Sequence, residues 1–177
     1  MDDVKLLGAS KESGAFAMEA NPEDTTYLVP AFSGLGAPYW DSEAKAAIVG
    51  MTRNTGKAEI VRAAEECIGY QIADLVLLMQ EASGLPVKEL RVDGGPTKDK
   101  FLMQFQSDLL NIPIAVPKNE ELSGIGAAYA AGFALGFWDQ SVYEKESRTR
   151  YTPQMDAETR ARKYGGWKAA VQSVLTK

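Results

Sequence analysis

The residues best suited to ligand binding lie where a short apolar strand meets a helix, in the string LRVDGGPTKDKFLMQFQSDLL at 90–110. Gly94 and Gly95 lack a Cβ, so a ligand ring or phosphate can approach the main chain closely, and positive φ values are available. The free N–H groups and positive dipole end of the helix that follows favour an anionic or hydrogen-bonding ligand. The pattern therefore indicates a binding site at this turn, although a tight strand-to-helix connection without a ligand has the same pattern.

The composition excludes several kinds of catalytic centre. The chain of 177 residues contains no histidine and one cysteine, Cys67. This excludes histidine-based metal sites, Ser-His-Asp triads and Cys-His pairs, and it excludes an internal disulfide. Cys67 falls on the apolar face of a predicted helix, so we interpret it as a packing residue. We predict no catalytic residue and no metal-ligand set in this chain.

Acidic and aromatic side chains each leave two interpretations open. Asp93, Asp108 and Glu66 are carboxylates of the kind that bind Mg²⁺, but acids near helix ends also serve as caps or ion-pair partners. The neighbouring aromatic residues Tyr39 and Trp40 could form a platform for a sugar, or they could anchor their own loop in a groove.

Composition and charge place the chain among soluble globular proteins. Apolar residues make up 45% and charged residues 24% of the chain, and the net charge is −5. The proportions are ordinary for a domain with one sizeable core, and the negative charge argues against nucleic acid or an anionic membrane as a partner. The longest apolar stretch, at 125–138, is shorter than the ~20 residues that a membrane-spanning helix needs. We therefore expect a cytoplasmic protein.

Strands and helices are predicted to alternate along the chain. Short β-rich or apolar runs predict strands at 25–32, 46–51, 90–92 and 112–116, and a 3.6-residue period predicts helices at 57–82, through 101–110, at 123–136 and at 156–175. Gly84 suits a helix cap, Gly165-Gly166 weakens the last helix, and 140–150 is expected to be a surface loop. The small residues of 123–136 suggest close packing of backbone on backbone. This alternation predicts an α/β fold, with a mainly parallel sheet flanked by helices.

Four strings carry a resemblance to a known family: 28–41, 46–64, 93–108 and 123–129. In this order they resemble the carboxy-terminal domain of the FGGY family of carbohydrate kinases, and within it the glycerol kinases. The resemblance implies an actin-like, RNase H-like ATPase lobe without its amino-terminal partner lobe. We expect one such domain over 1–177, with a leading segment at 1–24, a family-like core at 25–138, and a surface loop and terminal helix at 139–177.

The resemblance also implies which residues hold a nucleotide. In this family the Gly-Gly turn forms part of the adenosine site, so ATP or ADP is expected to bind at Gly94, Gly95, Pro96 and Asp99, with adenine against Gly95. Asp99 stands where the family usually has asparagine, so it lacks the amide donors; it could instead be a solvated first-turn acid that the helix dipole stabilises. Glu65 stands where the second FGGY signature normally has an apolar residue.

The activity implied by the resemblance is ATP- and Mg²⁺-dependent phosphorylation of glycerol to glycerol 3-phosphate. The family's aspartate base, carried in a DQQ-like string, does not occur in the sequence, and neither do its phosphate loop and polyol-binding residues. Phosphoryl transfer needs a base, Mg²⁺ and an aligned hydroxyl. We therefore expect the carboxy-terminal, adenosine-binding portion of such an enzyme, inactive alone and prone to form a homo-oligomer. The alternatives are a kinase of another sugar or polyol, and a non-catalytic nucleotide-binding or interaction module.

Overall fold

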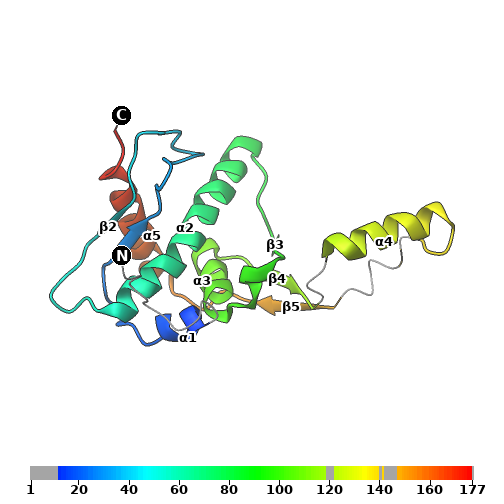
Figure 1. Ribbon diagram of the computed structural model, residues 1–177, viewed down its shortest axis with the longest axis horizontal. Helices are drawn as coiled ribbons and strands as arrows, with labels where there is room; N and C mark the ends of the chain where they lie inside the picture. Colours follow the sequence, from blue (N-terminus) through cyan, green and yellow to red (C-terminus); the bar gives the residue numbers. More distant parts are fainter. Residues whose placement is uncertain (1–11, 119–121, 140, 142–146, 177) are drawn as a thin grey trace, which may run out of the picture.

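The computed structural model describes residues 12–118, 122–139, 141 and 147–176 (Figure 1). The elements follow in the order α1 (Ser13–Ala17), β1 (Tyr27–Val29), β2 (Ala47–Val49), α2 (Lys57–Ser83), β3 (Leu90–Arg91), the 3₁₀ helix η2 (Gly95–Lys98), α3 (Lys100–Leu110), β4 (Ile114–Pro117), α4 (Leu122–Ala134), β5 (Arg148–Tyr151) and α5 (Ala157–Gln172). Each strand and helix predicted above has a counterpart, and α1, η2 and β5 are additional.

The strands form two small sheets, and the prediction of a mainly parallel sheet was wrong. β1 and β2 pair antiparallel, with Tyr27 opposite Val49. In the second sheet β4 lies between β3, to which it is parallel, and β5, to which it is antiparallel. β1 and β2 follow each other directly, and antiparallel neighbours need no crossover helix. Residues 148–150 were expected to belong to the surface loop, but residues 148–151 form an edge strand.

α2 is the longest helix and contacts α1, α3 and β1. Its amino end is capped by Glu59, whose carboxylate accepts hydrogen bonds from the Gly56 N–H at 2.8 Å and the Asn21 N–H at 2.9 Å. Its carboxyl end is closed by Gly84, which has φ +68° and donates its N–H to the Gln80 carbonyl. The predicted helix and its glycine cap are therefore confirmed.

The main core lies where α2, α3, α5 and β1 meet. The Tyr70 ring stacks on Trp167 with centroids 5.2 Å apart, and it meets Phe105 edge-on at the same distance. Gly166 lies directly under Tyr27, since a Cβ on this glycine would overlap the Tyr27 ring. α5 runs through both glycines without a break. Gly165-Gly166 was expected to weaken this helix, but Gly166 instead allows α5 to approach β1 closely.

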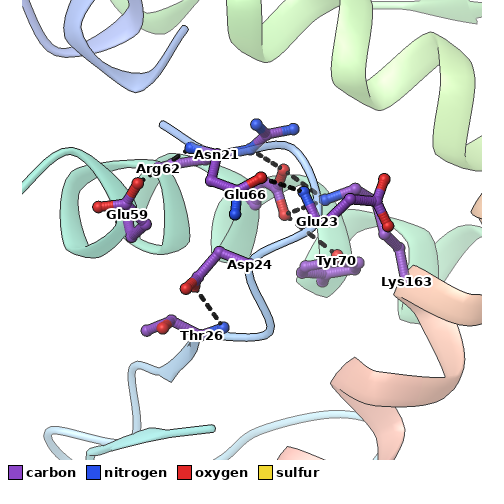
Figure 2. A network of polar contacts seen from close by, with 9 residues as sticks. All are labelled: Asn21, Glu23, Asp24, Thr26, Glu59, Arg62, Glu66, Tyr70 and Lys163. Atoms are coloured by element: carbon purple, nitrogen blue, oxygen red, sulfur yellow. Dashed lines mark hydrogen bonds and ion pairs between the residues drawn. The ribbon is translucent and has the colours of Figure 1, made fainter. Parts of the chain in front are cut away.

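A buried polar network joins α2 to α5 within this core (Figure 2). The Glu66 carboxylate accepts hydrogen bonds from Arg62 at 2.7 Å, from Lys163 at 3.0 Å and from the Tyr70 hydroxyl at 3.2 Å. Glu66 is 4% exposed and Lys163 is 6% exposed. Of the two interpretations of Glu66, the structure supports the ion-pair partner.

Two further buried carboxylates tie a loop to α5 and to the segment after it. Asp74 accepts hydrogen bonds from the Tyr39 hydroxyl at 2.7 Å and the Trp167 indole N–H at 2.8 Å. Asp41 accepts one from the Thr176 N–H at 2.6 Å and one from its hydroxyl at 2.9 Å. Burial and the hydrogen bond to Asp74 raise the pKa of the Tyr39 hydroxyl. Tyr39 therefore anchors its own loop, as the second interpretation of the aromatic pair predicted, whereas Trp40 is exposed.

Asp108 closes the turn between β5 and α5. Its Oδ1 accepts hydrogen bonds from the Gln154 N–H at 2.6 Å and the Gln104 side-chain amide at 2.9 Å. Asp108 therefore stabilises the turn that precedes α5 and does not cap that helix, whose N-cap is Asp156.

α4 stands apart from the other elements (Figure 1). A Cβ on Gly124 or Gly126 would meet no atom within 4 Å, so the expected close backbone packing is absent at these two glycines. Gly132 differs, because Trp138 folds back onto it and occupies the place of a Cβ. In the described part of the chain, no helix is long and apolar enough to cross a membrane, α4 included.

Candidate functional site

The glycine turn starts where β3 ends and leads through η2 into α3. Gly94 has φ +96° and ψ 175°, a region essentially restricted to glycine. The Thr97 hydroxyl donates a hydrogen bond of 2.7 Å to the Gly94 carbonyl and so closes the turn. At Gly95 a Cβ would meet no atom within 4 Å. The backbone thus requires glycine at Gly94, whereas Gly95 leaves open space beside the chain.

Asp99 is the N-cap residue of α3. Its Oδ1 accepts a hydrogen bond of 3.1 Å from the Leu102 N–H, and the carboxylate lies against Gly14 of α1, where a Cβ would overlap it. Asp99 thus lies at the helix start, as the alternative expected, but it is a half-buried N-cap and not a solvated first-turn acid. Contact with a nucleotide remains a prediction.

A pocket of about 400 Å³ opens beside this turn. Three of the four predicted nucleotide-binding residues, Gly95, Pro96 and Asp99, line it, while Gly94 does not. The remaining lining residues, which we did not predict to bind a nucleotide, come from α1, α2, η2 and α3: Ser13, Glu65, Ile68, Lys98 and Leu102.

The crossing of α2 and α3 explains why these residues meet. Gly69 of α2 faces Phe105 of α3 so closely that a Cβ on the glycine would lie 2.8 Å from the ring. One turn earlier on the two helices, Glu65 and Leu102 consequently reach the pocket. Ile68 follows Glu65 by three residues and shares its helix face. Of these lining residues, only Glu65 was unusual in the sequence. It is an acid at a position of the second FGGY signature that is normally apolar.

The polar lining of the pocket is rich in hydrogen-bond acceptors. Glu65 is half-buried. Burial raises the pKa of its carboxyl group, a hydrogen bond from the Ser13 side chain lowers it in part, and the negative charge of Asp99 raises it. The exposed ammonium group of Lys98 lies at the same pocket. Across residues 12–118, 122–139, 141 and 147–176, no group of three or more Asp, Glu, His or Cys side chains is arranged to hold a metal ion.

The solved structures that resemble this chain are carbohydrate kinases. The crystal structure of Plasmodium falciparum glycerol kinase with ADP matches 98% of this chain with a TM-score of 0.88 and 37% identity, and the match covers 35% of that protein. The ligand-bound xylulose kinase from Lactobacillus acidophilus matches 96% of the chain with a TM-score of 0.77. At 23% identity, the latter shows a common fold alone.

Sequence comparison leads to the same group of proteins. The chain is 44% identical over 175 residues to a glycerol kinase of Bacillus licheniformis, a match that covers 97% of this chain and 35% of the relative. The chain thus spans about a third of the length of the curated relatives it matches. Residues 4–135 match the carboxy-terminal domain of the FGGY family of carbohydrate kinases. The chain therefore belongs to that family.

Proposed function

We propose that this chain is the carboxy-terminal, adenosine-binding portion of an ATP-dependent kinase that phosphorylates glycerol to glycerol 3-phosphate. The observation that carries the proposal is the meeting of Gly95, Pro96 and Asp99 at one pocket beside the start of α3. The choice of glycerol is supported by relatives that are glycerol kinases at 44% identity. The choice of an adenosine nucleotide is supported by the similar Plasmodium enzyme, which was solved with ADP.

In this proposal the pocket holds the base and ribose of the nucleotide. The open space at Gly95 admits a flat ring, and Pro96, Ile68 and Leu102 supply apolar wall. The polyol, Mg²⁺ and the aspartate base belong to an amino-terminal lobe, so this chain contributes no catalytic group. Phosphoryl transfer depends on all of these parts together, and the chain alone is inactive.

The position of α4 supports assignment to one lobe of a two-lobed enzyme. Its small residues Gly124, Gly126, Ala127 and Ala128 are exposed, and the helix stands away from the remaining elements (Figure 1). Small side chains allow another backbone to approach closely. In the proposed enzyme the amino-terminal lobe covers this helix.

Calorimetric titration of the 177-residue chain with ADP and ATP, with and without Mg²⁺, tests the site. We expect weak binding that Gly95→Val reduces at least about tenfold, because the valine occupies the space of the ring; tenfold corresponds to about 1.4 kcal/mol. Gly165→Val is the matched control, since Gly165 also has open space around its Cβ position and lies on exposed α5 surface. Absence of nucleotide binding, or equal binding by Gly95→Val, would contradict the proposal.

The second part of the proposal concerns activity. The chain alone should release no ADP from Mg²⁺-ATP and glycerol in a coupled assay. Addition of a separately expressed amino-terminal portion of a glycerol kinase, such as that of Bacillus licheniformis, should produce turnover. Steady turnover by the 177-residue chain alone would show that the chain contains its own base.

A further inference from the structure

We propose that Glu65 recognises the base of the bound nucleotide, its carboxylate accepting a hydrogen bond from the exocyclic amino group of adenine. The inference rests on the proposed function and goes beyond it. The family resemblance assigns no such role, because the corresponding position in the FGGY signature is normally apolar. Glu65 and Asp99 both depart from the family pattern, and although they are 34 positions apart (99 − 65), both line the same pocket.

Glu65 lines the same pocket as the glycine turn. Gly95 and Pro96 contribute to the lining from η2, and Glu65 and Ile68, which share a face of α2, contribute to it from that helix. Leu102, which is 2% exposed, lines the pocket from the start of α3. A flat ring that fills the space from the turn to α2 therefore contacts the apolar side chain of Ile68 and presents an edge to Glu65.

The carboxylate of Glu65 can form hydrogen bonds only with an edge of the base that carries N–H donors. An ionised carboxylate only accepts hydrogen bonds, and its two oxygens offer about four lone-pair sites. Ser13 donates a hydrogen bond to Glu65, which leaves sites for a ligand. The 6-amino group of adenine offers two N–H donors, whereas unsubstituted purine, which carries hydrogen at that position, offers no N–H donor at this edge. Hydrogen bonds to a charged, partly buried acceptor are the stronger kind.

Glu65 is better suited to this role than Asp99. Asp99 already caps α3, through the hydrogen bond from the Leu102 N–H to its Oδ1, and its carboxylate is held against Gly14. Movement of Asp99 toward a ligand would break the hydrogen bond that caps α3. Glu65 lies within α2, and its longer side chain can turn toward the base without disturbing the helix.

The test compares ADP with purine riboside 5′-diphosphate, which differs from ADP by lacking the 6-amino group. Both are titrated into the 177-residue chain at pH 8, a pH chosen to favour the ionised carboxylate because burial raises the pKa of Glu65. We expect ADP to bind about tenfold more tightly, as a charge-assisted hydrogen bond allows. In Glu65→Leu the two affinities should agree to within about threefold, and Glu65→Gln, whose amide oxygen is a neutral acceptor, should give an intermediate ratio.

Glu81→Leu provides the matched control, because Glu81 is exposed on the same helix and lies away from the pocket. It should keep the wild-type ratio. Equal binding of the two nucleotides by the wild type, or an unchanged ratio in both Glu65 variants, would overturn the inference and leave the proposed function standing. If neither nucleotide binds, the proposed function fails, and the inference fails with it. Circular dichroism confirms that each variant is folded.

Discussion

Asp99 combines a structural role with a position at the pocket, and substitutions can separate the two. Asparagine caps a helix as well as aspartate, so Asp99→Asn should leave the free energy of unfolding within about 0.5 kcal/mol of the wild type. Asp99→Ala should lose about 1 kcal/mol with the cap. The amide also removes a negative charge and supplies donors, so ADP should bind roughly fivefold more tightly to Asp99→Asn. Urea denaturation and calorimetry measure the two effects, and weaker ADP binding by Asp99→Asn would contradict this role.

Cys67 gives a prediction about thiol reactivity and pH. Burial raises the pKa of its thiol from 9.0 to about 12, and the charge of Glu65 adds to the rise. The unfolded chain therefore loses this proton first as pH rises. The resulting stabilisation is complete below about pH 9 and declines toward pH 12, by at most about 1.4 kcal/mol per pH unit.

Two measurements test the burial and the raised pKa of the Cys67 thiol. At pH 8 the native thiol should react with a disulfide reagent such as DTNB far more slowly than in urea, and the signal is unambiguous because the chain has one cysteine. Between pH 9 and pH 12 the free energy of unfolding should fall less steeply in Cys67→Ala than in the wild type. Rapid labelling of the folded chain would show that the thiol is accessible.

At the scale of elements, α5 is an integral part of the core. Trp167 is fully buried, stacks on Tyr70 and donates a hydrogen bond to Asp74. Trp167→Ala should lower the free energy of unfolding by about 3–5 kcal/mol. Trp40 is 75% exposed, and Trp40→Ala should change stability by less than about 0.5 kcal/mol. Urea denaturation followed by circular dichroism gives both values, and similar losses in the two variants would contradict this role of α5.

Elements whose signals are local in the sequence were predicted well. The 3.6-residue period and Gly84 located α2, and β1 lies within the strand predicted at 25–32, although it ends at Val29, just before Pro30. β5 was missed because Arg148 and Arg150 suggested a solvated loop, and only pairing with β4 makes the segment a strand. The role of Gly166 likewise depends on Tyr27, which lies more than a hundred positions earlier.

The same difference between local and long-range signals applies to the residues of the candidate site. Gly95, Pro96 and Asp99 lie within one continuous string, so family resemblance was sufficient to select them. Ser13 and Glu65 belong to other helices and join the pocket through the packing of α1 and α2 against α3. That packing depends on the fit of Gly69 against Phe105, which a single sequence does not reveal.

At the scale of the whole molecule, an apolar stripe on α2 predicts self-association. Leu75, Leu78 and Met79 lie at helical spacing and are 41%, 40% and 65% exposed, and Leu85 follows at 69%. We expect the sedimentation coefficient of the chain to rise with concentration. The double variant Leu78→Lys/Met79→Lys should reduce this rise, because lysines remove apolar contact area and repel each other.

Gln71→Lys is the control for this prediction, since Gln71 is a polar, exposed residue of the same helix. It should associate as the wild type does. A single sedimentation coefficient from micromolar to millimolar concentration would contradict self-association.

The contacts of α5 and the residues after it also determine when the core can close during translation. Glu66 pairs with Lys163 across 97 positions, and Asp41 binds Thr176 across 135 positions. Until these partners leave the ribosome, the aromatic face around Tyr70 has no Trp167 to cover it. The nascent chain therefore exposes this face from the emergence of Tyr70 until Trp167 follows, and we expect chaperones to hold it until the residues around 163–176 emerge and folding can be completed.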